Sequence, residues 1–341
     1  MINWGIIGLG RIARDFAAGF LDVKNANLLG VASKTPDNLK EFKEKFKLSQ
    51  KYCFSNYDDL ISCENIDIIY IALPHNLHFE WIIKCLNNNK KILTEKPATS
   101  SLKDIKKINE ILNSKKIFFT EGFMYRYHPQ TSKIISLIKN NEIGELLSME
   151  SYFGINLIEK RNIFGFKKIK FNKKNRLFNK SLAGGCILDL GCYPSSLSIL
   201  ISQLKNPDSL EIELKNSKIE YSSSEVDIDS YTEINFSNGF KSHIGCSFKK
   251  DLGKGTKIIG SKGTLIIHDS WFCNPMKISL NNKDIIENNF NFSNIYSYEI
   301  ESISSAILKN KNEPDYPAIS RLETEKNINI LEDWLQSSSK K

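Results

Sequence analysis

Short apolar runs alternate with helical runs over the first 120 residues, and this alternation limits the folds that the chain can adopt. The apolar runs have the length of buried strands and lie at 3–7, 28–33, 51–55, 67–73, 91–97 and 117–120. Apolar residues at helical spacing follow most of these runs. Because such alternation is typical of a parallel sheet covered by helices, we predict a doubly wound α/β fold for this part of the chain.

A glycine-rich turn joins the first predicted strand to the first helix. Residues 8–13, GLGRIA, have the GxGxxA spacing of a dinucleotide-binding fingerprint. Gly8 permits the tight turn, and Gly10 lets the backbone approach a pyrophosphate at the helix N-terminus. We therefore expect a dinucleotide to bind here, and the alternative is an ordinary tight turn. The residues predicted to contact it are Gly8, Gly10, Arg11 and Ile12.

The end of the second predicted strand bears on the choice of dinucleotide. An NAD-specific site usually has an acidic residue there, which holds both ribose hydroxyls. In this chain the strand ends at Ser33-Lys34, and Asp37 follows only after Pro36. Ser33 and Lys34 can both donate to a 2′-phosphate, so we predict NADP as the cofactor, with NAD also possible. The alternative for Lys34 is a solvated loop lysine.

Polar residues follow the next two buried strands. Pro74-His75-Asn76 and then His78 come after one of them, and Glu95-Lys96 ends the KILTEKP stretch at 91–97. The carboxyl ends of parallel strands face the ligand crevice, so we predict that these residues line it. Pro74, His75, Asn76, Glu95 and Lys96 are expected to contact the cofactor. Two alternatives stay open: His78 can hydrogen-bond to backbone, and the charged pair can lie in a surface turn.

The pattern changes from Leu146 onward. Strand-like runs now dominate, and Asn238-Gly239 is a strong hairpin signal between two of them. These runs lie at 146–155, 211–219, 230–237, 240–248, 256–260, 263–268 and 277–280. Two helices are predicted at about 294–309 and 319–335. We therefore predict two domains, 1–121 for the dinucleotide and 122–341, mostly antiparallel, for the substrate.

Two short segments of the second predicted domain combine polar and apolar residues. The hinge Glu121–Pro129 places Arg126 among aromatic residues, and a buried arginine needs an anionic or polar partner. In the segment Gly184–Pro194, Asp189 and Tyr193 are four residues apart, so on a helix they share one face. The alternatives are interdomain packing of the hinge aromatics and a hydrogen-bonded core pair at Asp189 and Tyr193.

The composition excludes several classes of protein. The seven cysteines are odd in number and form no CxxC pair, which favours reduced thiols in a cytoplasmic protein over a disulfide framework or a zinc site. We see no apolar run of membrane-spanning length and no basic signal-peptide region. The net charge of +8 is locally dense at 167–180. With few aromatic residues and no nucleic-acid-binding module there, this charge does not favour a nucleic-acid partner.

Several of these segments together resemble the Gfo/Idh/MocA family, which comprises glucose–fructose oxidoreductase, inositol dehydrogenase and their relatives. The resemblance covers essentially the whole chain. Within the family, the hinge and Tyr193 are most similar to the dihydrodiol dehydrogenase and NADP-dependent xylose dehydrogenase branch. The matching segments are GLGRIA at 8–13, ALPHNLH at 72–78, TEKP at 94–97, EGFMYRYHP at 121–129, GGCILDLGCYP at 184–194 and IIGSKGTLII at 258–267.

The resemblance implies an N-terminal Rossmann domain and a C-terminal α+β domain with an open, mostly antiparallel sheet. The flat face of that sheet commonly forms a dimer interface in the family, so a homodimer or homotetramer is expected. Lys96, Asp189 and Tyr193 match the catalytic positions of the family, and His78 matches an active-site histidine of the dihydrodiol branch. We also expect Arg126 and Arg176 to bind substrate. No metal is expected.

The implied reaction is hydride transfer between the nicotinamide and a carbinol or carbonyl carbon of a sugar, polyol or vicinal diol. The substrate oxygen must lose or gain a proton in step, and Tyr193 can exchange it. A phenol with a pKa near ~10 is a poor base at neutral pH, and a nearby Lys96 cation would lower that pKa. Asp189 could orient a neighbouring hydroxyl and keep Lys96 charged.

Two other functions stay open at this point. One is a non-catalytic member of the same fold that senses the cofactor or a sugar; retention of Lys96, Asp189 and Tyr193 together speaks against it. The other is a nucleotide-sugar dehydrogenase. The stretch 167–180, rich in lysine, leads directly into the predicted catalytic helix, so we expect it to border the substrate entrance and to favour anionic substrates.

Overall fold

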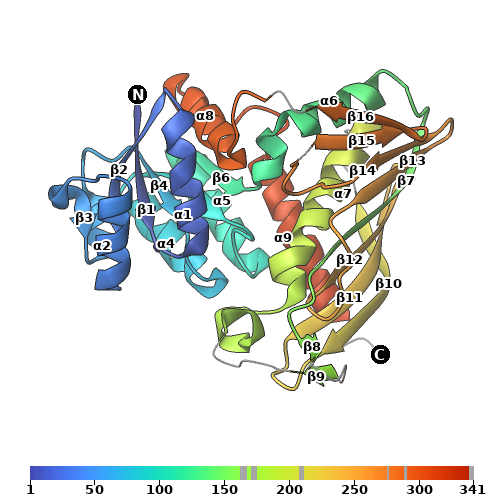
Figure 1. Cartoon of the computed structure of the whole chain (residues 1–341), viewed down its shortest axis with the longest axis horizontal. Helices are drawn as coiled ribbons and strands as arrows, with labels where there is room; N and C mark the ends of the chain where they lie inside the picture. The colour runs from blue at the N-terminus through green and yellow to red at the C-terminus, as the bar shows by residue number, and fades with distance from the viewer. Residues whose placement is uncertain (162–166, 170–174, 207–210, 275, 288–289, 338–341) are drawn as a thin grey trace. The chain divides into compact units, whose positions relative to one another are not determined.

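The computed structural model describes residues 1–161, 167–169, 175–206, 211–274, 276–287 and 290–337. Its first compact unit comprises Met1–His128 and Phe290–Glu325, and its second comprises Pro129–Asn289 and Lys326–Lys341. The first unit is built on a six-stranded parallel sheet in the order β3-β2-β1-β4-β5-β6 (Figure 1). The strands are β1 Ile2–Ile7, β2 Ala26–Ala32, β3 Cys53–Phe54, β4 Ile68–Ile71, β5 Lys91–Glu95 and β6 Phe119–Gly122.

Helices connect these strands, as the alternating sequence pattern predicts. They are α1 Arg11–Ala18, α2 Pro36–Lys45, α3 Tyr57–Ser62, α4 His75–Asn87 and α5 Leu102–Lys115. The strand order reverses between β1 and β4, and this is the switch point at which doubly wound sheets bind ligands. Buried on both faces, the central strands read as continuous apolar runs, and every residue of β4 is buried.

Helix α8 (Ile295–Leu308) belongs to the first unit, although it lies far along the chain. The indole of Trp4 donates to Ser304 Oγ at 3.0 Å, and Ser297 Oγ donates to the carbonyl of Gly19 at 2.9 Å. These contacts hold α8 against β1 and the segment after α1. The compact units therefore differ from the predicted domains 1–121 and 122–341, because residues 122–128 and 290–325 lie close in space to the rest of the first unit.

Arg126 is fully buried within the first unit, in the 3₁₀ turn Met124–Tyr127. Its Nη2 lies 3.2 Å from Glu323 Oε1, and its Nη1 donates to the carbonyl of Pro317 at 3.1 Å. Glu323 lies in the first turn of α9 (Arg321–Gln336) and is itself buried. Glu323 therefore compensates the Arg126 charge inside the unit, and the role of Arg126 in substrate binding stays a prediction.

The second unit is built on an eight-stranded sheet in the order β10-β11-β12-β7-β13-β14-β15-β16. Strands β12 and β7 run parallel and the other neighbours run antiparallel, so the sheet is mixed but mostly antiparallel, as predicted. The described residues also include a short antiparallel strand pair, β8 (Glu159–Arg161) with β9 (Lys167–Ile169). The strands of the large sheet are β7 Leu146–Gly154, β10 Ile212–Tyr221, β11 Asp227–Phe236, β12 Lys241–Ser247, β13 Thr256–Gly260, β14 Thr264–Ile267, β15 Met276–Leu280 and β16 Lys283–Glu287.

Helices α6 (Pro129–Lys139) and α7 (Cys192–Lys205) also belong to this unit, and α7 packs on β7 and β12. The helical stretch Lys180–Lys205 is long and apolar enough to pass as a membrane span by length and composition, contrary to the expectation from the sequence. However, 94% of its most apolar window is buried inside the protein, as is typical of the core helix of a globular unit.

The buried Arg126–Glu323 pair yields a test of stability. Glu323→Gln keeps the size of the side chain but leaves the guanidinium charge uncompensated in the core. We expect the free energy of unfolding to fall by about 3–5 kcal/mol, measured by urea denaturation.

The matched control is Glu41→Gln, because Glu41 pairs with Arg14 at 2.8 Å through side chains that are 51% and 27% exposed. Removal of this surface pair should cost no more than about 1 kcal/mol. If the free energy of unfolding falls equally in the two variants, burial of the Arg126 charge does not depend on Glu323.

Candidate active site

The turn after β1 requires glycine at its first position. Gly8 has a φ of +87°, and a Cβ atom there would lie 2.5 Å from the carbonyl oxygen of Ala72. Its backbone N–H donates to the carbonyl of Ala32 at 3.1 Å, so the turn is tied to the end of β2. Any side chain would separate β1 from the segment that follows β4, at the switch point of the sheet.

The second glycine leaves room at the start of α1. Gly10 is the N-cap residue, and no described residue beyond its chain neighbours and its own helix lies within 4 Å of the position that its Cβ would occupy. No described side chain caps this end, so the first backbone N–H groups of α1, those of Arg11 and Ile12 among them, have no side-chain acceptor. Unpaired donors, a positive dipole end and free volume are what a pyrophosphate needs. The residues present therefore fit a dinucleotide.

Ser33 and Lys34 directly follow β2, whose last residue is Ala32. Ser33 is buried, and its Oγ accepts a hydrogen bond from the Thr35 N–H at 3.1 Å, which leaves the hydroxyl proton available to another acceptor. Lys34 is exposed, and its Nζ lies 5.5 Å from the centroid of the Tyr57 ring. Asp37 lies in the first turn of α2 rather than at the strand end. The predicted strand boundary is therefore correct to within one residue.

His78 lies in the first turns of α4 and is fully buried. Its Nδ1 is 2.8 Å from the carbonyl oxygen of Pro97, and its Nε2 is 2.8 Å from that of Leu73. The ring therefore joins the segments that follow β4 and β5. Both ring nitrogens thus face backbone carbonyl oxygens, as in the structural alternative for His78, and its role in substrate binding stays a prediction. Of its neighbours, Pro74 and His75 are partly or fully buried, whereas Asn76 is exposed.

Glu95 and Lys96 emerge at the end of β5, and both side chains are partly buried. The Tyr70 hydroxyl of β4 donates a hydrogen bond to Glu95 Oε1. Burial, and then the nearby Glu95 charge, raise the pKa of Tyr70 well above its usual value, so the phenol acts as a donor here. Tyr70 also stacks on Phe16 of α1, with ring centroids 4.0 Å apart. Glu95 is thus positioned by the core of the first unit.

A π-helical turn carries Asp189 in the second unit. It spans Ile187–Gly191 and continues directly into α7, whose first turn carries Tyr193. Wide turns of this kind are rare and occur frequently at functional sites. Gly185, with a φ of +122°, precedes the turn, and the buried Asp227 of β11 accepts the Ile187 N–H at 2.6 Å. A Cβ on Gly185 would lie 2.0 Å from Asp227 Oδ1, so the glycine is required for this contact.

Asp189 and Tyr193 have different surroundings. Asp189 Oδ1 lies 3.2 Å from Nη2 of Arg176, and the two side chains are 12% and 46% exposed. Arg176 can therefore hold Asp189 while part of its guanidinium meets solvent. The Tyr193 ring lies 5.4 Å from that of Phe153 and 5.5 Å from that of Trp271. Sequence reasoning missed both aromatic neighbours, because each lies on a separate strand or turn with no motif around it.

The lysine-rich stretch 167–180 falls partly outside the described residues. Lys170, Lys173 and Lys174 lie outside them, and Lys167 and Lys168 are described only as the backbone of β9. Lys180 pairs with Glu225 at 3.3 Å, and both side chains are largely exposed. The role predicted for this stretch stays a prediction.

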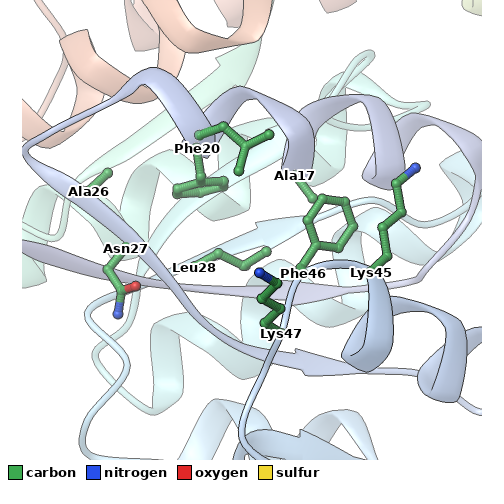
Figure 2. Close-up of a pocket in the computed structure, with 9 residues that line it drawn as sticks. Ala17, Phe20, Ala26, Asn27, Leu28, Lys45, Phe46 and Lys47 are labelled. Carbon is green, nitrogen blue, oxygen red and sulfur yellow. The ribbon is translucent and has the colours of Figure 1, made fainter.

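A pocket in the first unit is distinct from the residues predicted to bind the cofactor. Figure 2 shows this cavity of about 260 Å³, in which Phe20, Leu28 and Phe46 supply apolar surface and Lys45 and Lys47 supply charge. It lies at Ala26–Leu28, where β2 begins, whereas Ser33 and Lys34 follow the end of the same strand. Within the part of the chain that the structure describes, no group of three or more His, Cys, Asp or Glu side chains could hold a metal.

Two relatives that are named for an enzymatic activity are similar to this chain, one of them over nearly its whole length. Trans-1,2-dihydrobenzene-1,2-diol dehydrogenase of Xenopus tropicalis is 26% identical, over 98% of this chain and 97% of the relative. The NADP(+) D-xylose 1-dehydrogenase of Hypocrea jecorina is 30% identical over a shorter region, 57% of this chain and 51% of the relative. Both relatives are named as dehydrogenases.

Solved structures show the same fold. The aldose–aldose oxidoreductase of Caulobacter crescentus superposes with a TM-score of 0.83 at 18% identity, covering 99% of this chain and 97% of that one. A 3-ketoreductase of Actinomadura kijaniata, solved with NADP and TDP-benzene, superposes with a TM-score of 0.81 at 18% identity, covering 97% and 96%. At this identity the likeness concerns the fold.

Family models match most of the chain. The model described as an oxidoreductase family with an NAD-binding Rossmann fold matches residues 2–123, and the model of the corresponding C-terminal domain matches residues 131–266. Together with the named relatives, these matches identify an enzyme with an NAD(P)-binding Rossmann domain. The chain therefore belongs to the Gfo/Idh/MocA family of oxidoreductases.

Proposed function

We propose that this enzyme is an NADP-dependent oxidoreductase that acts on a carbinol or carbonyl carbon of a sugar, polyol or vicinal diol. The observation that carries the proposal is the retention of Lys96 at the end of β5 together with Asp189 and Tyr193 on one continuous helix. The substrate class is supported by the relatives, which are named for a vicinal diol and for D-xylose.

The first unit supplies the groups that would hold the cofactor. The glycine turn at Gly8 and Gly10 and the N–H groups of Arg11 and Ile12 would hold the pyrophosphate. Ser33 and Lys34 would donate to a ribose 2′-phosphate, and residues after β4 and β5 would line the nicotinamide end. When bound, the nicotinamide supplies the chemistry of accepting or giving a hydride.

The protein residues handle the proton. When a carbinol carbon loses hydride, its oxygen must release a proton to become a carbonyl; in the reverse direction the oxygen takes one up. We assign this exchange to the Tyr193 hydroxyl and assign to the Lys96 ammonium a hydrogen bond to the same substrate oxygen. Asp189, held by Arg176, would accept a hydrogen bond from a neighbouring substrate hydroxyl.

A non-catalytic sensor would keep the fold without turnover. A spectrophotometric screen with NADP⁺ and NADPH separates the two functions, run over aldoses, polyols, diols, diketones and nucleotide sugars. Nucleotide sugars are included because one relative, 25% identical over 78% of this chain, is a dTDP-sugar 3-reductase of Saccharopolyspora spinosa. Absence of turnover with every member of the screen would favour the sensor.

Lys96 and Tyr193 are the first residues to test. We expect Lys96→Ala and Tyr193→Phe each to lower kcat at least ~100-fold, because general acid–base groups contribute on this scale. The cofactor should still bind, as measured by quenching of protein fluorescence on titration with NADPH, because neither change removes a phosphate contact.

Matched controls are Lys91→Ala, at the opposite end of the same strand, and Tyr221→Phe, an exposed tyrosine at the end of β10. Both should keep kcat near that of the natural protein. A near-normal kcat in Tyr193→Phe would remove Tyr193 from the mechanism.

The preference for NADP over NAD is the second test. We expect kcat/KM to favour NADP by about 10- to 150-fold, since a charge-assisted hydrogen bond contributes about 1.5–3 kcal/mol. Lys34→Ala should narrow the difference, mainly by weakening NADP. The control is Lys24→Ala, an exposed lysine before β2 at the opposite edge of the sheet. Equal values for the two cofactors in the unmodified enzyme would contradict the assignment of Ser33 and Lys34.

A further inference from the structure

Glu121 is a fully buried carboxyl group that none of the assigned roles uses. It is the next-to-last residue of β6, and it lies beside Thr94 of β5 in the parallel register. The two strands end at the same level of the sheet, since Glu95 pairs with Gly122. The side chain of Glu121 therefore lies next to the segment that follows β5. That segment contains Lys96.

The carboxyl group of Glu121 binds this segment directly. Its Oε1 accepts the backbone N–H of Ala98 at 2.9 Å, two residues after Lys96. On the other side, the ring of His78 lies 2.8 Å from the carbonyl oxygen of Pro97. Two consecutive residues are therefore held by buried polar side chains, and the backbone that carries Lys96 has little freedom to move.

Charged groups surround Glu121 on several elements. Burial raises the pKa of its carboxyl group to about 7, against the opposing effects of the Ala98 N–H, the Thr324 hydroxyl, Arg126 and Lys96. Arg126 is already paired with Glu323, so it neutralises Glu121 only in part. Among the described residues, Oε2 of Glu121 has no hydrogen-bond partner, and this adds to the cost of the ionised form.

We propose that Glu121 is a positioning residue for Lys96, because its buried carboxylate anchors the segment 96–98 and attracts the Lys96 ammonium. The inference rests on the role of Lys96 in the proposed function. Glu121 has no contact with a reacting atom in this assignment; it acts through the place and charge of Lys96.

The sign of the pH dependence follows from the direction of the pKa shift. Above about pH 7 Glu121 is ionised, and the anion accepts the Ala98 N–H more strongly than a neutral carboxyl group does. As the pH falls through about 7 the group takes up a proton, and its attraction for Lys96 is lost. The kcat of the natural enzyme should therefore decrease toward acidic pH, with a midpoint near 7.

Glu121→Gln is the first test, because glutamine keeps an acceptor for Ala98 and removes the charge. We expect kcat above neutral pH to fall on the order of 10- to 100-fold, since small displacements of a catalytic group have effects of this size. The decrease near pH 7 that Glu121 causes should disappear, while the Kd for NADPH stays unchanged. A kcat and pH profile equal to those of the natural enzyme would overturn the proposal.

Thr324→Val provides a second test that leaves Glu121 in place. Removal of the Thr324 hydroxyl removes one of the effects that lower the pKa of Glu121, so the decrease in kcat should move to higher pH. The matched control is Glu299→Gln. Glu299 is another buried carboxyl group of this unit whose pKa burial raises well above its usual value, but its Oε1 lies against Gly122. If the pH at which kcat decreases shifts in Glu299→Gln but not in Thr324→Val, a group other than Glu121 controls the pH dependence, and the proposal is contradicted.

Hydrogen exchange of the Ala98 amide tests the anchoring without turnover. At one fixed pH, the peptide covering 95–101 should exchange fastest in Glu121→Ala, more slowly in Glu121→Gln and slowest in the natural protein. Equal exchange in all three would refute the anchoring. A different result is expected if the proposed function is wrong. In that case Lys96→Ala keeps the kcat of the natural enzyme, while the order of exchange rates among the Glu121 variants stays as given above.

Discussion

The backbone pairing of β5 between β4 and β6 is the constraint on which the candidate site of the first unit depends. Ile92 and Leu93 of β5 are fully buried, so the strand cannot slip without exposing its apolar side chains. Pairing stops at Glu95, and Lys96 is the first residue beyond it. The backbone position of Lys96, the proposed catalytic lysine, is therefore determined by the parallel register of β5.

The other candidate groups of this unit also lie at the carboxyl ends of the strands of this sheet. The glycine turn follows β1, Ser33 and Lys34 follow β2, and His78 lies after β4. All strands of a parallel sheet run in the same direction. Their carboxyl ends, and the segments that follow them, therefore lie on the same side of the sheet. The parallel topology thus brings together residues that are as far apart in the sequence as Gly8 and Lys96.

Buried ionisable groups hold three local segments of this structure in place. Arg126 with Glu323 stabilises a 3₁₀ turn, Asp227 caps the π-helical turn that carries Asp189, and Glu121 binds the segment after Lys96. Each such group costs free energy to bury and is compensated by specific backbone or side-chain partners. In two of the three cases the partner is a backbone N–H two residues from a candidate catalytic residue. The buried carboxyl group therefore restrains the backbone of the segment that carries this residue.

The sequence by itself determined the alternation of strands and helices over the first 120 residues, the glycine fingerprint and the mostly antiparallel character of the second sheet. These follow from the spacing of neighbouring residues and from turn chemistry, which are local properties. It missed β16, a short strand in which Lys283 and Asp284 interrupt the apolar pattern expected of a sheet strand.

Only the tertiary structure decided what the polar side chains contact. From the sequence, His78 and Arg126 fit a binding role as well as a structural one, and Glu121 appeared only as the start of a hinge. Their partners are Pro97, Glu323 and Ala98, which are 19 to 197 residues away along the chain. Burial and charge compensation depend on such distant neighbours, because the cost of burying a polar group is set by what surrounds it in space.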